Sequence, residues 1–227
     1  MKPCLSSPER GDFGLLDLLV MLIAVAAVAL VGYAYLNTRG SRPKAQQINC
    51  VNNLKQIGLS YRLWGGDNGE KYPANVSTNA GGTMELVPSG FAFPNFLVMS
   101  NELGTPKIII CPEDKKRSYV AGFDLLKSDA NVSYFTVPEA DESNAELWLS
   151  GDRNLATNTV ALKPGLFTLP TNRVMSWTAQ IHKHKGNIAL SDGSVQQFND
   201  ARLQQSATNV MRIWLATTNA PFRLVIP

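Results

Sequence analysis

The sequence is poor in the residue types from which catalytic sites are usually built. It contains two histidines in 227 residues, and its acidic residues are scattered rather than paired at a recognisable spacing. It also lacks the G-x-S-x-G, H-E-x-x-H, P-loop and Rossmann glycine patterns, which place a nucleophile, a metal ion or a phosphate. These absences argue against hydrolases, zinc proteases and nucleotide-binding enzymes, and we predict a protein that is not an enzyme.

Cysteine and charge are limited as well. Three cysteines are too few for a disulfide-dense scaffold, although they allow one bridge in an oxidising compartment. The formal net charge is +3 without a dense cluster of lysine and arginine, so nucleic acid is not predicted as a partner. The chain is long enough for one domain with a substantial core in addition to an apolar segment.

The longest apolar run covers residues 13–36 and contains a single charged side chain, Asp17. As a helix, these two dozen residues extend about 35 Å, which is enough to cross the hydrocarbon core of a bilayer. The run is longer than the apolar part of a typical signal peptide, and no A-x-A-like site follows it. We therefore predict a retained single-pass membrane helix, with a cleaved secretory signal as the alternative.

The start of this run has a recognisable pattern. Residues 10–20, RGDFGLLDLLV, resemble the start of type IV prepilins and type II secretion pseudopilins. The resemblance implies a cytoplasmic leader, residues 1–12, and recognition by a prepilin peptidase through Gly11, Asp12, Phe13 and Asp17. A cut before Phe13 places Asp17 at mature position five, and a cut after Gly11 places it at six. In that family, the acid at position five pairs with the terminal amine of a neighbouring subunit, which lowers the cost of a carboxylate in lipid.

Residues 37–44 predict a kinked linker, because Pro43 cannot donate a helical hydrogen bond and clashes with the preceding turn. From Ala45 the pattern is helical again for about twenty residues and ends at Gly65 and Gly66. Apolar residues recur there at steps of three and four, which predicts a buried stripe. Its members are Cys50, Leu54, Ile57, Tyr61 and Trp64.

A second resemblance covers nearly the whole chain. Residues 50–73 resemble the segment after the membrane helix in bacterial pseudopilin-like proteins that carry a C-terminal H-x9-DG element, which here is His182 followed by Asp192 and Gly193. The two alternating runs joined by Asp192-Gly193 predict a tight hairpin with a type I′ turn. The implied architecture is a pilin-like α+β lollipop. A long N-terminal membrane helix continues into an extracytoplasmic domain, residues 45–227, with a small antiparallel sheet and a C-terminal helix.

Two cysteines lie on segments that can face each other. Residues 108–110 are a short apolar run that predicts a buried strand, and Cys111 follows it. We predict that Cys111 forms a disulfide with Cys50, which would stabilise the domain by about 4 kcal/mol in the chain-entropy model. Two buried thiols are the alternative.

The C-terminal half predicts further strands and a helix. Residues 131–135 and 147–150 are expected to pair as a wide hairpin. Residues 151–154, GDRN, predict a turn whose Asp and Arg bond locally, with a polar pocket or cation site as the alternative. A helix is expected from Asn199 or Asp200 to about Thr217, followed by a final edge strand over residues 222–226.

The two histidines invite a metal hypothesis with Asp192, but His182 and His184 share a face only in a strand, and we favour a structural hairpin without a cofactor. Major pseudopilins bind calcium in a C-terminal loop, so calcium stays open. The resemblances imply a structural subunit of a type II secretion or type IV pilus-like system in the inner membrane, with a periplasmic domain. Its implied partners are other pseudopilin subunits or secretion-system proteins. The alternative is a membrane-tethered domain that binds a ligand such as a glycan and does not polymerise.

Overall fold

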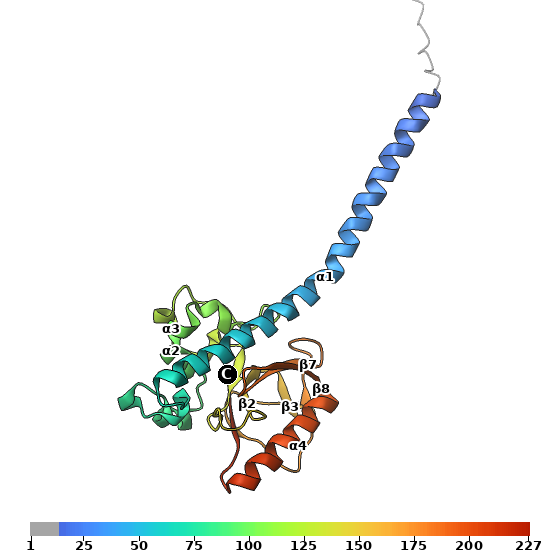
Figure 1. Cartoon of the computed structure of the whole chain (residues 1–227). Helices are drawn as coiled ribbons and strands as arrows, with labels where there is room; N and C mark the ends of the chain where they lie inside the picture. Colours follow the sequence, from blue (N-terminus) through green and yellow to red (C-terminus); the bar gives the residue numbers. More distant parts are fainter. Residues whose placement is uncertain (1–13) are drawn as a thin grey trace, which may run out of the picture. The chain divides into compact units, whose positions relative to one another are not determined.

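The computed structural model describes residues 14–227, and for residues 37–44 it describes the backbone alone. The described chain is α+β, with an N-terminal apolar helix, antiparallel sheets and a C-terminal helix, as predicted (Figure 1). It divides into two compact units, Met1–Lys44 and Ala45–Pro227.

The first long element is α1 (Leu15–Asp67). Its first part, Leu15–Leu36, has a mean hydropathy of 2.7 over the most apolar window, and none of that window is buried. Among the residues that the structure describes, Leu15–Leu36 is the one helical segment that is long and apolar enough to span a membrane. The prediction of such a helix is confirmed in this respect.

The backbone of α1 is helical through residues 37–44, where the sequence predicts a break. The two predicted helical segments are therefore parts of one continuous element, and the kink at Pro43 stays a prediction. Proline costs a helix one hydrogen bond and a local clash, which amounts to about 3 kcal/mol. Strong helix-forming segments on both sides of Pro43 offset that cost, so the helix continues instead of ending.

The second part of α1 has the predicted buried stripe. Cys50, Leu54 and Ile57 are 0% exposed, and Tyr61 and Trp64 are almost fully buried. The helix ends at Asp67, just beyond the predicted end at Gly65 and Gly66. The three- and four-residue spacing therefore identified the face that packs into the domain core.

The strands form two antiparallel sheets, of six and three strands. The order in the first sheet is β5-β9-β1-β2-β7-β8, and in the second it is β4-β3-β6. The bounds are β1 (Tyr134–Thr136), β2 (Trp148–Asp152), β3 (Leu155–Thr157), β4 (Val160–Ala161), β5 (Gly165–Thr168), β6 (Met175–Trp177), β7 (Lys185–Leu190), β8 (Val195–Asn199) and β9 (Arg223–Ile226).

The predicted wide hairpin is confirmed, because β1 and β2 pair antiparallel with Phe135 opposite Gly151. The predicted final strand exists as β9, but it is not at an edge. Val225 lies opposite Thr136 of β1 on one side and opposite Leu166 of β5 on the other. The run over residues 222–226 is almost entirely apolar, which suits a strand with neighbours on both sides better than an edge strand.

The predicted hairpin of β7 and β8 is confirmed, but its turn differs. Leu190 N donates to Ser194 O at 2.8 Å, and Gly193 N donates to Leu190 O at 2.9 Å, so three residues form the loop. In the loop Gly193 has a positive φ of 83°, whereas Asp192 does not have one. This is a three-residue hairpin loop with glycine at the left-handed position, rather than a type I′ turn.

The predicted strand over residues 108–110 is wrong. The chain forms a 3₁₀ turn at Pro106–Ile109, although these isoleucines are buried as expected. The Thr105 side chain accepts a hydrogen bond from Lys107 N, and Pro106 occupies the first position of the turn. A capping threonine followed by proline starts a helical turn, which overrides the strand preference of isoleucine.

The remaining helical elements are short, except for the last. α4 (Asp200–Thr217) is capped by Asn199, one of the two predicted capping residues, whose side chain accepts a hydrogen bond from Arg202 N at 2.9 Å. Trp148 Nε1 donates to Ser206 Oγ at 2.9 Å, which joins β2 to α4. The others are α2 (Phe93–Val98), α3 (Ser100–Leu103) and 3₁₀ turns at Pro73–Asn75, Thr78–Ala80, Met84–Ser89, Phe123–Leu125 and Asp129–Asn131.

Candidate functional site

Three of the residues assigned to peptidase recognition, Gly11, Asp12 and Phe13, lie outside the described residues. The fourth, Asp17, lies in the first turn of α1, where Oδ2 accepts a hydrogen bond from Gly14 N at 3.1 Å. A carboxylate in the first turn of a helix is favoured by the exposed N–H groups there. Asp17 thus has a local partner, and its side chain remains exposed.

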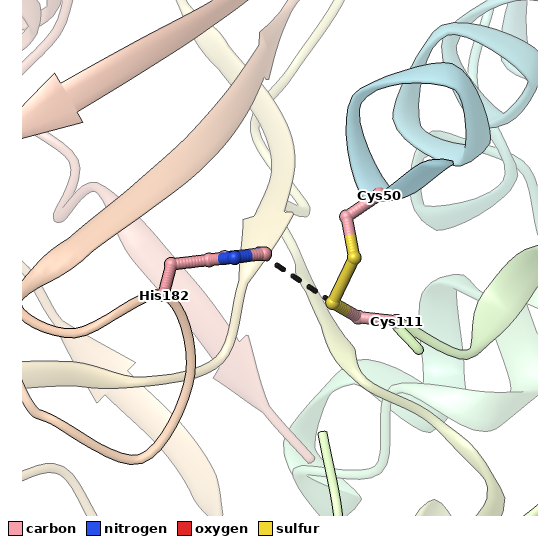
Figure 2. Close-up of side chains that lie close together, drawn as sticks. All are labelled: Cys50, Cys111 and His182. Atoms are coloured by element: carbon pink, nitrogen blue, oxygen red, sulfur yellow. Dashed lines mark hydrogen bonds between the residues drawn. A yellow bond between two sulfur atoms is a disulfide. The ribbon is translucent and has the colours of Figure 1, made fainter. Parts of the chain in front are cut away.

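The predicted disulfide is present between Cys50 of α1 and Cys111, with a Cα–Cα distance of 5.0 Å. Both cysteines are 0% exposed. Figure 2 shows that the bridge projects from α1 toward the segment that carries Cys111, and that the ring of His182 points at it from the other side. The bridge therefore fixes α1 to the domain at a buried point, which agrees with folding in an oxidising compartment.

His182 lies in the turn before β7, and its side chain is 0% exposed. Its Nε2 atom is 3.4 Å from Cys111 Sγ (Figure 2). The same atom is 3.4 Å from Asp152 Oδ2. On the opposite side of the ring, Nδ1 is 3.0 Å from Glu113 Oε2, which also accepts a hydrogen bond from His182 N. The histidine of the H-x9-DG element therefore connects the disulfide, strand β2 and the segment after Cys111.

The backbone around His182 is unusual. His182, Lys183 and His184 have positive φ angles of 55°, 50° and 61°, a conformation that costs non-glycine residues about 1 kcal/mol each. Asn154 holds this turn, because its Nδ2 donates to the carbonyls of Ile181, Lys185 and Thr178 at 2.9, 3.2 and 3.1 Å. Tertiary hydrogen bonds thus maintain a conformation that the local sequence does not favour.

The segment GDRN was expected to bond locally, and this prediction is wrong. Asp152 ends β2 and accepts from Asn187 N and Nδ2 at 2.7 and 2.8 Å. Arg153 instead contacts Asp114 through two hydrogen bonds, of 2.6 and 2.7 Å. Polar residues that end a buried strand meet partners from other segments, which a turn assignment cannot anticipate. The sequence signal that could have indicated the partner of Arg153 was the acidic pair shortly after Cys111, Glu113 and Asp114.

Burial determines the electrostatics of Asp152. Its side chain is fully buried, and desolvation raises the pKa of its carboxyl group from 3.8 to about 6. His182 and the two N–H donors of Asn187 oppose this increase, whereas the charge of Asp114 adds to it. The second carboxylate oxygen, Oδ1, is buried without a hydrogen-bond partner, which explains why ionisation remains costly.

This pKa predicts a dependence of stability on pH. The folded chain binds the Asp152 proton more tightly than the unfolded chain, so the stability contributed by this group falls as pH rises from about 4 to about 6. In urea unfolding, the free energy of unfolding of the wild type, relative to that of Asp152→Asn, should fall across this window by on the order of 3 kcal/mol. Asp192→Asn, at an exposed turn, is the control. A difference that stays constant with pH would contradict the assignment.

The Asp192-Gly193 part of the H-x9-DG element lies at a different point of α1. A Cβ atom on Gly58 would lie 3.4 Å from Gly193 Cα, so the hairpin loop and the helix are in close contact. Asp192 itself faces solvent and accepts from Ser194 N at 2.8 Å, which stabilises the loop. The element therefore meets α1 directly through Gly193 at Gly58, and indirectly through His182, which contacts the Cys111 sulfur of the bridge to Cys50.

The close contact predicts a specific size limit at Gly58. Gly58→Leu should lower the free energy of unfolding by about 2 kcal/mol, because the added side chain displaces the hairpin loop. Gly66→Leu is a matched control on the same helix, since no atom lies within 4 Å of a Cβ at that position. Denaturant unfolding of both variants measures the effect, and equal losses in the two would show that the contact is unimportant.

The cluster has limited chemical options. Within the part of the chain that the structure describes, Cys50, Cys111 and His182 form a group of potential metal ligands whose donor atoms lie within 4.8 Å of one another. Both sulfur atoms are used in the disulfide, so the group does not offer thiolate ligands in this state. His184 does not belong to this group of potential ligands. Its Nδ1 lies 3.1 Å from Trp177 O.

The burial of the cluster indicates what it does in this conformation. The cysteines, Asp152 and the ring of His182 are all 0% exposed, so a substrate cannot contact them. The contacts instead join α1, β2 and the turn before β7 into one core. No known family model, no curated protein and no solved structure matches the chain.

Proposed function

We propose that this protein is a single-pass membrane subunit of a type II secretion or type IV pilus-like system and assembles with copies of itself or related subunits. The observation that carries the proposal is α1, a single element that is apolar and exposed in its first part and packed into a folded domain in its second. Such a helix suits a subunit that is held in the inner membrane before it enters a filament, with its domain in the periplasm.

The exposed part of α1 supports membrane insertion. Leu15–Leu36 comprises 22 residues, which extend about 33 Å as a helix. Its large apolar side chains are mostly more than half exposed, for example Val25 at 66%. A surface of this kind needs lipid or other apolar helices as its environment. In a pilin-like assembly both are available, first in the bilayer and then in the filament core.

Asp17 is the feature that distinguishes assembly from simple anchoring. A carboxylate near the end of a membrane helix is costly, and a cationic partner lowers the cost. In pilins that partner is the terminal amine of the next subunit, which prepilin peptidase generates. We propose the same role for Asp17, after cleavage of the leader next to Gly11, Asp12 and Phe13.

The disulfide and the H-x9-DG contacts support the rest of the proposal. A subunit whose helix is pulled within a filament needs a domain that does not separate from that helix. Cys111 and Gly193 contact α1 at Cys50 and Gly58, which are about two turns apart. A disulfide also agrees with a periplasmic location of the domain.

Photo-crosslinking of the full chain in membranes tests the proposal. A photoreactive residue at Val25 should give adducts between copies, and the same residue at Leu215 of α4, which is 48% exposed, is the matched control. Asp17→Asn should reduce the Val25 adducts by about threefold or more without releasing the protein from the membrane. Adducts to lipid alone, with no copy-to-copy product, would contradict assembly.

A second function, a tethered ligand-binding domain that does not polymerise, has its own support. Two cavities of about 610 and 380 Å³ share Asp141, Trp214 and Thr218 and form a groove beside the C-terminal end of α4. An aromatic ring with carboxylate and hydroxyl neighbours is suitable for contact with a glycan. The intact mass of the membrane-extracted protein separates the two functions, since an uncut, unmethylated N-terminus favours the tether.

A further inference from the structure

A separate cavity on the domain has an unusual concentration of positive charge. It measures about 260 Å³ and lies between the segment after Cys111, the end of β2 and the connection between β4 and β5. Its wall includes three cationic side chains, Lys116, Arg117 and Arg153. No carboxylate is among the residues that line it.

The charges of these cations are incompletely neutralised. Arg153 is paired with Asp114, whose side chain is 1% exposed. Arg117 Nε donates to the neutral carbonyl of Val132 at 2.9 Å, and burial together with the nearby charge of Arg153 lowers the pKa of Arg117. The carboxylate of Asp129 is bonded to backbone N–H groups of α2 and its N-cap. The carboxylates of Asp114 and Asp129 both act on Arg117, so two carboxylates stand against three cations and a net positive charge remains at the cavity, which attracts an anion.

The rest of the wall is chemically mixed. Ala161, Leu162 and Pro164 contribute accessible apolar surface, and Thr178 and Gln180 contribute a hydroxyl and an amide. Inorganic phosphate or sulfate has no apolar part that could contact the apolar side of the wall. A ligand that matches the whole wall has a carboxylate, several hydroxyl groups and a face of C–H groups.

We propose that this cavity binds a sugar acid, with its carboxylate on Arg117 and Lys116, its hydroxyl groups on Thr178 and Gln180, and its C–H face on Leu162 and Pro164. Arg153 is paired with Asp114 and forms one wall of the cavity, so Arg117 and Lys116 supply the charge that the carboxylate meets. The proposal concerns the unit Ala45–Pro227 and does not depend on membrane insertion or on assembly. A volume of about 260 Å³ accommodates one six-membered ring.

Calorimetric titration of the detergent-solubilised full chain tests the proposal, with glucuronate as the probe. We expect saturable binding with a Kd below about 1 mM, and no saturable binding of glucose, which lacks the carboxylate. Inorganic phosphate at the same ionic strength should bind at least about tenfold more weakly, because it has no C–H face. Absence of saturable glucuronate binding, or equal affinity for phosphate, would overturn the proposal.

Variants locate the binding site. Arg117→Met should weaken glucuronate binding about tenfold or more, because it removes a charge-assisted hydrogen bond. Since this change also removes the bond to Val132, circular dichroism must show that the variant is folded. Lys116→Ser, at an exposed side chain, keeps the test independent of folding and should weaken binding about threefold or more. Lys115→Ser, next to it but outside the cavity wall, is the matched control. Equal effects at Lys115 and Lys116 would reject this cavity as the site.

Discussion

Replacing both Cys50 and Cys111 by alanine is expected to lower the free energy of unfolding by about 4 kcal/mol. The bridge closes a segment with a sequence separation of 61 residues, and the unfolded chain gains conformational freedom when it is removed. Because stabilities of single domains are usually about 5–15 kcal/mol, this loss would remove a large part of the total. Urea unfolding monitored by tryptophan fluorescence measures the change.

Reductant provides the internal control for this prediction. Dithiothreitol should destabilise the wild type by a similar amount and should leave the unfolding of the Cys50→Ala, Cys111→Ala variant unchanged. A variant as stable as the wild type would show that the bridge does not stabilise the fold. Insensitivity of the wild type to reductant under unfolding conditions would favour two thiols beside His182, which was the alternative from the sequence.

Replacing Arg153 by methionine is expected to cost about 3–5 kcal/mol, because it leaves the carboxylate of Asp114 buried without its cation. The Arg153 and Asp114 side chains are 10% and 1% exposed, so the ion pair is largely shielded from water. Lys116 N donates to the same carboxylate at 3.1 Å, but one backbone donor does not replace a charged partner with two hydrogen bonds.

Two variants separate the pair from general damage. Arg62→Met breaks an exposed ion pair with Glu142, in which Arg62 is 52% exposed, and should cost at most about 1 kcal/mol. The double variant Arg153→Met, Asp114→Leu should recover much of the loss, because it also removes the uncompensated charge. A double variant as unstable as Arg153→Met alone would show that the cost comes from packing.

Sequence patterns were sufficient for elements whose signal is local. The spacing of Cys50, Leu54 and Ile57 identified the buried face of α1, and Asn199 identified the start of α4, because helix periodicity and capping involve residues close in sequence.

The contacts of the buried cluster were not available from such patterns. Asp152 and Arg153 were expected to bond within their own turn, yet their partners Asn187 and Asp114 are 35 and 39 residues away. The H-x9-DG spacing indicated a hairpin and implied nothing about the disulfide. That His182 reaches Cys111 depends on three consecutive left-handed residues, a conformation that no local preference predicts.

The sequence by itself therefore determined that this protein has an apolar helix long enough for a membrane, an amphipathic continuation, paired strands and a capped C-terminal helix. Each of these depends on the order of apolar and polar residues over one or two dozen positions. Only the tertiary structure decided that β9 lies inside the sheet, that Arg153 pairs with Asp114, and that His182 packs on the bridge. These contacts join residues far apart in the chain, and their geometry exists only once the strands and α1 have packed around a common core.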